Sequence, residues 1–239
     1  IMRTFGLIGK NLSHSFSKEF FRKKIFLERI KETEYLNFEI DNISNLRNLI
    51  NKKNILGLNI TIPYKERVIP YLDEIRVDAK NIGAVNTIKI IKNKIIGYNT
   101  DFIGFKESIR PIMKNKNTAL ILGNGGAAKA VRYALDKLQI KHKTITRNSE
   151  NDYNNISQTD MKYYKIIINT TPLGMHPNKD SFPKIPYKLL NKEHLLYDLV
   201  YNPSKSIFLN NGEKYNCTIK NGVEMLQIQA NHSWKIWHS

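Results

Sequence analysis

A glycine-rich turn constrains the fold of this chain more than any other feature of its sequence. The run ALILGNGGAAKAV places Gly123, Gly125 and Gly126 between an apolar strand pattern and an alanine-rich helical pattern. Glycines allow a tight turn and close approach of the backbone to a ligand, and the start of the following helix offers unpaired N–H groups to a pyrophosphate. The turn therefore predicts a dinucleotide-binding α/β unit, although strand-to-helix loops also use glycine for steric reasons alone.

Strand and helix patterns alternate along the rest of the chain, which is typical of an α/β protein built on parallel sheets. Apolar runs predict strands over 4–8, 35–40, 55–61, 85–91, 95–98, 118–122, 143–146, 166–169, 195–198 and 218–219. Apolar residues at helical spacing predict helices over 18–30, 44–51, 101–113, 127–138 and 222–237. The strands over 85–91 and 95–98 should form a hairpin, and the pattern restarts near residue 100, which predicts two units.

The segment after the second strand of the dinucleotide unit bears on the choice of cofactor. An Asp or Glu at this place would hydrogen-bond the free ribose 2′-hydroxyl of NAD. The sequence has Thr146, Arg147 and Asn148 there instead. A guanidinium group suits a 2′-phosphate because it can bind phosphate through two N–H groups. These residues favour NADP, and the alternative is an ordinary surface arginine after a strand.

Several polar side chains in residues 1–101 stand where a fold alone would not require them. They are Ser15, Ser17, Asn59, Thr61, Lys65, Asn86 and Asp101. Each also has an ordinary explanation. Ser17 could be a helix N-cap, Asp101 could complement the dipole of the helix that it begins, and Lys65 could be one of many solvated lysines.

Taken together and in order, these residues and several later motifs resemble the shikimate dehydrogenase family from Phe5 to Trp237. The matching segments are Gly9–Ser17, Asn59–Lys65, Ala84–Thr87, Asn99–Gly104, Gly123–Ala127, Asn169–Met175, Asp198–Pro203 and Gly222–Ala230. Lys18 replaces a proline that is common in the family, and the family's N-R-T reads T-R-N at Thr146–Asn148.

The resemblance implies a two-domain α/β fold with a cleft between the domains. The substrate-binding and catalytic domain would comprise residues 1–100 plus 222–239, so that the last helix packs back onto it. The second domain, residues 101–221, would be a Rossmann-type NADP domain with a parallel sheet. The implied reaction is the NADPH-linked, reversible reduction of 3-dehydroshikimate to shikimate in the biosynthesis of chorismate and aromatic amino acids.

The resemblance also implies a role for each matching residue. Lys65 and Asp101 would be the catalytic pair. The substrate would be bound by Ser15, Ser17, Thr61, Asn86, Asp101, Tyr201 and Gln229. The cofactor would be bound by Gly123, Asn124, Gly125, Gly126, Ala127, Thr146, Arg147, Asn148, Leu199 and Gly222. We expect no metal ion in the site.

Composition limits the remaining options. The formal charge of +17 comes from lysines spread along the chain, which favours attraction of anionic small molecules over a dedicated nucleic-acid face. One cysteine, Cys217, excludes an intrachain disulfide, and no apolar run is long enough to span a bilayer. We therefore expect a cytoplasmic enzyme with a small-molecule substrate and without nucleic-acid or membrane partners. A homodimer is an option that the sequence leaves open.

Three alternative functions stay open at this point. A quinate/shikimate dehydrogenase with broader substrate or cofactor use would share the fold and most of these residues. A catalytically silent protein that senses shikimate or nucleotide would not need both Lys65 and Asp101. A basic nucleic-acid binder would show an affinity that falls steeply with salt.

Overall fold

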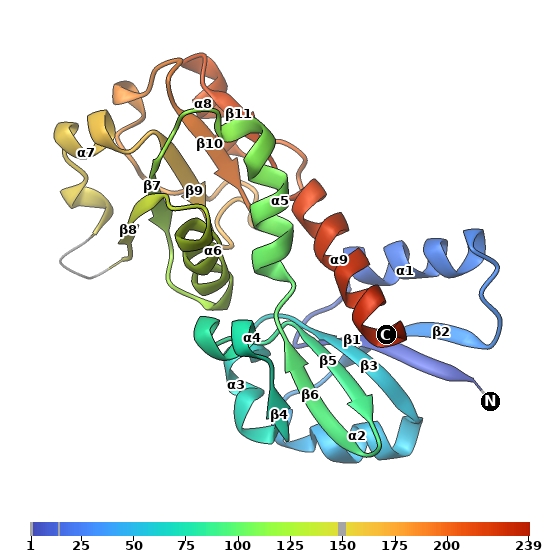
Figure 1. Cartoon of the computed structure of the whole chain (residues 1–239). Helices are drawn as coiled ribbons and strands as arrows, with labels where there is room; N and C mark the ends of the chain where they lie inside the picture. The colour runs from blue at the N-terminus through green and yellow to red at the C-terminus, as the bar shows by residue number, and fades with distance from the viewer. Residues whose placement is uncertain (1, 14, 148–151) are drawn as a thin grey trace. The chain divides into compact units, whose positions relative to one another are not determined.

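The computed structural model describes residues 2–13, 15–147 and 152–239 (Figure 1). The chain divides into two compact units, and each has its own sheet. Unit 1 comprises Ile1–Thr100 and Gln229–Ser239, and unit 2 comprises Asp101–Ile228. The predicted α/β class is confirmed. The division after Ile228 falls inside the last helix, whereas the sequence placed the corresponding boundary at residue 222.

Unit 1 is a six-stranded mixed sheet in the order β2-β1-β3-β5-β6-β4. Its strands are β1 (Arg3–Gly9), β2 (Thr33–Glu39), β3 (Ile55–Ile60), β4 (Glu74–Ile75), β5 (Thr87–Ile91) and β6 (Lys94–Tyr98). Strands β2, β1 and β3 are parallel, but β5 is antiparallel to both β3 and β6. Unit 1 therefore has a mixed sheet, in which the predicted β5–β6 hairpin is present as an antiparallel pair.

The hairpin turn is formed by Lys92 and Asn93, both of which have positive φ, 48° and 63°. Ile91 pairs with Lys94, so the connection has two residues. Two-residue turns with positive φ match the right-handed twist of the strands that they join. The turn thus explains why β6 returns directly beside β5.

Two hydrophobic layers cover the sheet of unit 1. Its helices are α1 (Phe16–Leu27), α2 (Leu46–Lys53), α3 (Tyr64–Arg67), α4 (Val77–Ile82) and the end of α9 (Val223–His238). Phe5 and Leu7 of β1 pack in one layer with Phe21 of α1 and Trp234 of α9. Their neighbour Ile8 lies in the opposite layer with residues of α2 and α3. This alternation is the period of two that a strand imposes on its side chains.

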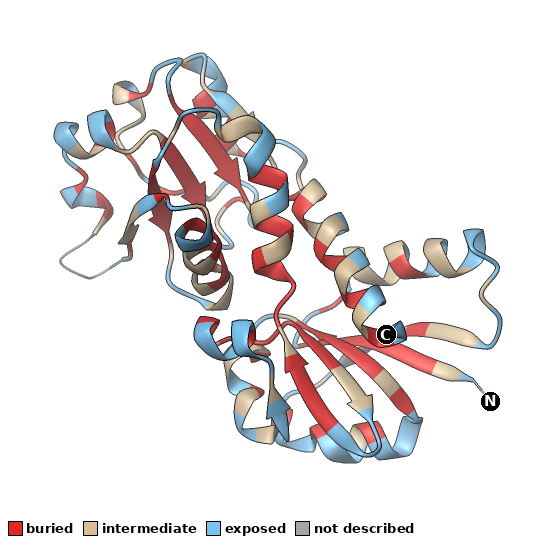
Figure 2. Ribbon diagram, in the orientation of Figure 1, coloured by how far each residue is buried: buried red, intermediate tan, exposed pale blue. Residues whose placement is uncertain are grey.

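Unit 2 is a five-stranded, fully parallel sheet in the order β11-β10-β9-β7-β8. Its strands are β7 (Thr118–Leu122), β8 (Lys141–Ile145), β9 (Ile166–Asn169), β10 (Leu195–Asp198) and β11 (Thr218–Lys220). Its helices within the unit are α5 (Asp101–Met113), α6 (Gly126–Lys137), α7 (Gln158–Tyr163) and α8 (Ile207–Lys214). Strands β7, β9 and β10 are buried along their whole length (Figure 2).

The strand order of unit 2 reverses between β7 and β9, because the chain passes from β7 to β8 on one side and then to β9 on the other. In open α/β sheets, ligands bind outside the carboxyl ends of the strands at such a reversal. Gly123 directly follows β7, and Thr170 directly follows β9. The fold therefore favours ligand binding at this pair of strand ends.

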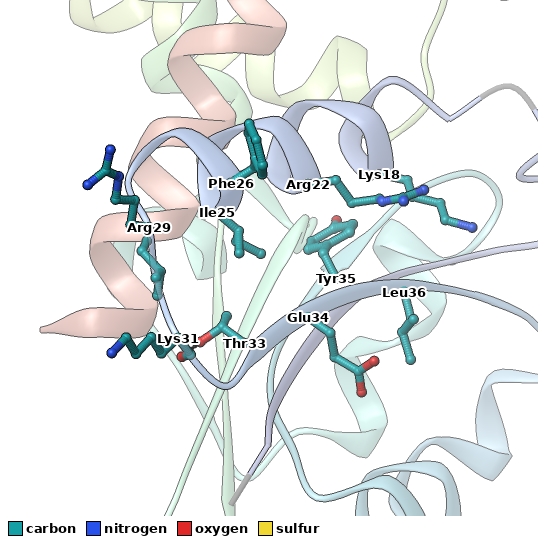
Figure 3. Close-up of a pocket in the computed structure, with 11 residues that line it drawn as sticks. Lys18, Arg22, Ile25, Phe26, Arg29, Lys31, Thr33, Glu34, Tyr35 and Leu36 are labelled. Atoms are coloured by element: carbon teal, nitrogen blue, oxygen red, sulfur yellow. Dashed lines mark hydrogen bonds between the residues drawn. The ribbon is translucent and has the colours of Figure 1, made fainter.

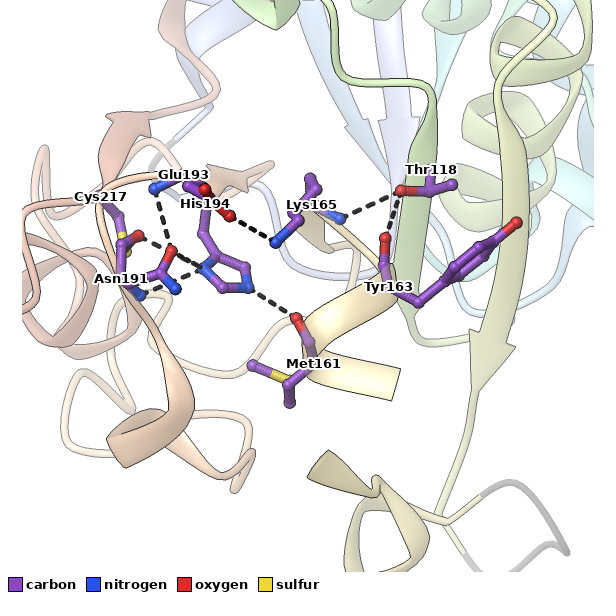
Figure 4. Close-up of polar contacts among 8 residues, drawn as sticks. All are labelled: Thr118, Met161, Tyr163, Lys165, Asn191, Glu193, His194 and Cys217. Carbon is purple, nitrogen blue, oxygen red and sulfur yellow. Dashed lines mark hydrogen bonds and ion pairs between the residues drawn. The ribbon is translucent and has the colours of Figure 1, made fainter. Parts of the chain in front are cut away.

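The opposite, amino-terminal edge of the same sheet is closed by a polar cluster (Figure 4). Buried His194 accepts the backbone N–H of Asn191 at Nδ1 (3.1 Å), so its Nε2 carries the proton that is donated to the Met161 carbonyl at 2.8 Å. Thr118 donates to the Tyr163 carbonyl at 2.6 Å. Burial raises the pKa of the nearby Cys217 thiol to about 11. These contacts pair the loops at this edge with one another, which indicates a structural role.

Helix ends in the structure follow local capping chemistry. Helix α7, which the sequence patterns did not predict, begins with a capping box in which Ser157 and Asp160 bond reciprocally to each other's backbone N–H. Helix α5 has the predicted bounds and continues through Pro111 to Met113. Within the described ranges, no helix combines the length and the apolar character that crossing a membrane requires.

Candidate active site

Six of the predicted site residues belong to unit 1 and come from four separate segments of the chain. They are Ser15, Ser17, Thr61, Lys65, Asn86 and Gln229. Ser15 and Ser17 follow β1, Thr61 and Lys65 follow β3, and Asn86 directly precedes β5. Because β1 and β3 are parallel and β5 runs the other way, all these segments belong to one edge of the sheet.

The first segment shows which serine caps α1. Ser15 has extended backbone angles, and its hydroxyl accepts the backbone N–H of Lys18 at 3.3 Å. Ser15 is therefore the N-cap, and Ser17 lies inside the first turn of the helix. The N-cap explanation that the sequence left open for Ser17 is wrong. Instead, the Ser17 side chain lies near the hydroxyl of Tyr35 on β2 and acts to lower the pKa of that hydroxyl.

The short helix that carries Lys65 is held in place by one side-chain contact and one backbone contact. The buried ring of Tyr64 anchors α3, and its hydroxyl donates to the Ile40 carbonyl at 2.5 Å. The carbonyl of Lys65 accepts the N–H of Val85 at 2.7 Å. This contact ties α3 to the segment that carries Asn86. The half-buried Lys65 side chain is thus mounted on a fixed turn next to that segment.

The Asn86 side chain connects segments that belong to separate motifs in the sequence. Its Oδ1 accepts the backbone N–H of Thr100 at 2.7 Å, and its Nδ2 donates to Oε1 of Gln229 at 3.2 Å. The Asn99 side chain donates to the Ala84 carbonyl at 2.9 Å. The structure therefore brings Asn86 and Gln229 together, although 143 positions separate them in the sequence.

Asp101 begins α5 and is only 5% exposed. It is the first residue of unit 2, whereas Lys65 belongs to unit 1. The pairing of Lys65 with Asp101 stays a prediction. Tyr201 also lies in unit 2, where it is half-buried in the segment after β10.

Two glycines of the turn in unit 2 differ in how much space a Cβ atom would find beside them. Gly123 has a φ of 112°, and a Cβ there would lie 2.7 Å from the Thr170 hydroxyl oxygen. At Gly125, the N-cap of α6, a Cβ would meet no heavy atom within 4 Å among the described residues. Gly123 is thus required by the turn itself. The open space at Gly125 and the N–H groups of the first turn of α6 suit the close approach of a pyrophosphate.

The remaining residues of the turn are exposed or half-buried. Asn124 is exposed and accepts a hydrogen bond from Arg132 at 2.8 Å, while Gly126 and Ala127 begin α6. Arg147 is exposed after β8, and its positive charge acts against the rise that burial causes in the pKa of Tyr153. Thr146 precedes it, and Asn148 lies outside the described residues. A cationic side chain therefore stands where a 2′-phosphate would be expected.

A buried carboxylate that is not among the predicted site residues organises the carboxyl ends of β9 and β10. Asp198 accepts hydrogen bonds from Asn169 Nδ2 (2.9 Å), from the N–H of Val200 (3.0 Å) and from the Ser206 hydroxyl. Burial raises its pKa to about 6, against the lowering effect of these hydrogen bonds. Asp198 thus fixes the backbone on either side of Leu199, one of the predicted cofactor contacts.

Gly222 approaches the same segment so closely that a side chain would not fit. A Cβ at this position would lie 2.2 Å from the carbonyl oxygen of Leu199. The N–H of Gly222 donates to the Val200 carbonyl at 3.2 Å. The two predicted cofactor contacts Leu199 and Gly222 are therefore adjacent in space, and the reason for glycine is steric.

Two open grooves run along α1 in unit 1. One lies between α1 and β2 and is lined by Lys18, Arg22, Phe26 and Arg29 among others (Figure 3). The second is lined by Ser13, Ser15, Lys23 and Glu39 among others. Neither groove is lined by Lys65, Asn86 or Gln229. The candidate site is therefore the polar edge of the sheet, and the second groove adjoins it at Ser15.

The fold and these residues define a class of protein, namely a two-unit α/β enzyme with a Rossmann-type dinucleotide turn. Residues 7–88 match the family described as "Shikimate dehydrogenase substrate binding domain". A "Shikimate dehydrogenase (NADP(+))" of Clostridium beijerinckii is 40% identical over 99% of this chain and 92% of its own length. This chain belongs to the shikimate dehydrogenase family.

Solved structures agree with this assignment. A shikimate dehydrogenase in complex with NADP+ is 34% identical, with a TM-score of 0.86 over 99% of this chain and 90% of that chain. The shikimate dehydrogenase of Thermus thermophilus in complex with NADP(H) and shikimate is 25% identical, with a TM-score of 0.86 over 99% and 93%. The resemblance that the motifs indicated is thus confirmed over nearly the whole chain.

Proposed function

We propose that this chain catalyses the NADP-dependent, reversible oxidation of shikimate to 3-dehydroshikimate in the biosynthesis of chorismate and aromatic amino acids. The observation that carries the proposal is the junction of Asn86, Thr100 and Gln229 on the sheet edge that also presents Thr61 and Lys65. Amide and hydroxyl groups concentrated on one edge suit a small polyhydroxylated ring. Such groups reject analogues that lack a hydroxyl, because the buried polar atoms would be left unpaired.

The residues of unit 2 fit NADP. The open space at Gly125 would admit a pyrophosphate at the start of α6, and Arg147, exposed after β8, would bind the 2′-phosphate. Leu199 and Gly222, which are adjacent in space, would contact the cofactor as well. When bound, the nicotinamide supplies the redox chemistry by accepting or giving a hydride.

The protein's own task is to orient the substrate and to move one proton. Oxidation breaks the C–H and the O–H bond of one ring carbon, so a base must take the hydroxyl proton. We assign this proton to the amine of Lys65, which returns it to the carbonyl oxygen in the reverse direction. Asp101 would hydrogen-bond and orient Lys65 and contact a ring hydroxyl. Ser15, Ser17, Thr61 and Tyr201 would bind the carboxylate of the substrate.

The test is to incubate the purified chain with shikimate or quinate, each with NADP or NAD, and to follow formation of the reduced nicotinamide. The proposal expects shikimate with NADP to give the highest kcat/KM. Equal or faster turnover of quinate would identify the broader quinate/shikimate dehydrogenase instead.

Localisation and assembly are separate proposals. The chain has a single cysteine and so cannot form an intrachain disulfide. Its fold therefore does not depend on an oxidising compartment, which supports a cytoplasmic location. Analytical ultracentrifugation of the purified chain would decide between a monomer and the homodimer that the sequence left open.

A further inference from the structure

A chain of hydrogen bonds inside unit 1 connects predicted substrate-binding residues from opposite ends of the sequence. It passes through polar side chains that the sequence analysis did not assign to the site. Its members, in spatial order, are Ser17, Tyr35, Asn59, Ser233, Thr87, Thr100, Asn86 and Gln229. All of them except Ser17 are at most 5% exposed.

The first link runs from Ser17 through Tyr35 to Asn59. Tyr35 stands on the side of β2 that faces α1, where its ring stacks on Phe21 at a centroid distance of 4.5 Å (Figure 3). Burial raises the pKa of its hydroxyl well above the ordinary value, and the hydrogen bond from Ser17 opposes this rise. The hydroxyl lies 2.9 Å from Oδ1 of Asn59. Tyr35 therefore stays protonated and donates to Asn59, with the Ser17 side chain nearby.

The orientation of the Asn59 amide follows from its backbone partner. Its Nδ2 lies 3.4 Å from the carbonyl oxygen of Asn86, which can only accept a hydrogen bond. Oδ1 must then be the end that accepts from Tyr35. The same Nδ2 donates to the Ser233 hydroxyl on α9 at 2.9 Å.

Ser233 in turn contacts two threonines. Its hydroxyl oxygen lies 2.8 Å from the Thr87 hydroxyl oxygen and 3.2 Å from that of Thr100. Ser233 follows Gln229 by one helical turn, so both side chains lie on the same face of α9. The serine therefore connects the strands of the sheet to the helix that carries Gln229.

The orientation of the last amides is fixed in the same way. The backbone N–H of Thr100 can only donate, so the atom of Asn86 that it contacts at 2.7 Å must be Oδ1. Nδ2 of Asn86 then donates to Gln229, and the receiving atom must be Oε1. The Thr100 hydroxyl lies 3.3 Å from the same Oε1. Gln229 is thereby held with its oxygen toward Asn86 and its two N–H donors on the other side of the amide.

We propose that Tyr35 is a positioning residue that acts through this chain on Ser17 at one end and on Asn86 and Gln229 at the other. The proposal rests on the proposed function, in which these residues bind the substrate. Inside a protein such networks are strengthened by the low dielectric, and loss of one member leaves buried partners unpaired. Tyr35 thus supports the positions of Asn59 and Ser233, which contact the threonines beside Asn86 and Gln229, while backbone groups set which way the amides of Asn59 and Asn86 point.

The test is Tyr35→Phe, which keeps the ring against Phe21 and removes only the hydroxyl. We expect the KM for shikimate to rise about tenfold, with kcat and the KM for NADP within about twofold of the unmodified enzyme. Tyr197→Phe is the matched control. Tyr197 is equally buried, and its hydroxyl lies 2.6 Å from that of Ser108 within unit 2. This control should lower the melting temperature and leave the KM for shikimate unchanged.

Two further variants keep the proposal falsifiable. Ser233→Ala breaks the chain at a second point and should raise the KM for shikimate in the same way. The double variant Tyr35→Phe with Ser17→Ala should raise the KM for shikimate by clearly less than the product of the two single-variant increases, because both residues act through one connection.

The proposal is overturned if the KM of Tyr35→Phe stays within about twofold, if the Ser17 and Tyr35 effects multiply in full, or if Tyr197→Phe raises the KM equally. An unmodified chain that oxidises shikimate while Tyr35→Phe has no effect refutes only the role of Tyr35. An unmodified chain without this activity refutes the proposed function as well.

Discussion

Nδ2 of Asn169 donates to Oδ1 of Asp198 across the carboxyl ends of β9 and β10, at 2.9 Å. The bond joins two motifs that are 29 residues apart in the sequence. Oδ1 of Asn169 accepts the N–H of Thr171 at 3.1 Å, while Asp198 accepts the N–H of Val200 at 3.0 Å. One buried amide–carboxylate pair thus shapes the loops after both strands, where the cofactor is expected.

Asp198 should make folding stability depend on pH. Its folded-state pKa of about 6 lies above the ordinary value of 3.8, so the protonated form is favoured in the native state. Its contribution to stability is fully present below about pH 3.8 and is lost as the pH rises through about 6. Compared with Asp198→Asn, which keeps the shape but cannot ionise, the unmodified chain should lose up to about 3 kcal/mol of unfolding free energy between pH 4 and 7.5.

Urea unfolding of both proteins across this pH range measures the difference. The exposed Asp180→Asn is the control, and its unfolding free energy should run parallel to that of the unmodified chain. Parallel curves for Asp198→Asn as well would show that Asp198 is not the titrating group.

Gly123 and Gly125 should respond differently to alanine. Gly123→Ala places a Cβ at positive φ and 2.7 Å from the Thr170 hydroxyl, so it should lower both stability and NADP affinity. Gly125→Ala has space in the described structure, so its unfolding free energy should change by less than about 0.5 kcal/mol. If the pyrophosphate occupies that space, the KM for NADP should still rise at least about fivefold. An unchanged KM for Gly125→Ala would place the pyrophosphate elsewhere.

Arg147 should determine the preference for NADP over NAD. Arg147→Ala removes the cation expected at the 2′-phosphate, and we predict that the ratio of kcat/KM values for NADP and NAD falls about tenfold or more. Arg110→Ala, at an exposed position on α5, is the control and should leave the ratio unchanged. Equal kcat/KM for both cofactors in the unmodified enzyme would defeat this prediction.

Lys65→Ala should abolish most turnover while shikimate binding stays largely intact, because the proton transfer loses its base but the hydroxyl and amide ligands remain. Turnover is measured by formation of reduced nicotinamide, and binding by calorimetry. Lys80→Ala, an exposed lysine on α4, is the control. A kcat within about threefold of the unmodified enzyme would contradict the role of Lys65.

The long, strongly patterned elements of this fold could be predicted from the sequence. The bounds of β7, β9, β10 and α5 match the expected ranges, because each is a buried apolar run or a sustained helical pattern. Elements such as β4 and α3 were not predicted, because two to four residues are too few to show a period. The mixed sheet of unit 1 depends on which strands pair, and local patterns do not determine pairing.

The residues of the candidate site could likewise be predicted only in part. Asn86 and Gln229 could be named from motifs, and the structure brings them together. Tyr35, Ser233 and Asp198 were missed because their importance lies in contacts between distant segments. A weak signal existed for Ser233, since it follows Gln229 by four positions and so shares its helical face. Asn59 carried another, as a polar residue inside an otherwise apolar strand.

The most direct test of the central claim is the initial rate of NADPH formation when the purified chain is given shikimate and NADP. We expect steady formation of NADPH, faster than with quinate or with NAD, and near-complete loss of the rate in Lys65→Ala. Absence of NADPH formation from shikimate by the folded, unmodified chain would contradict it.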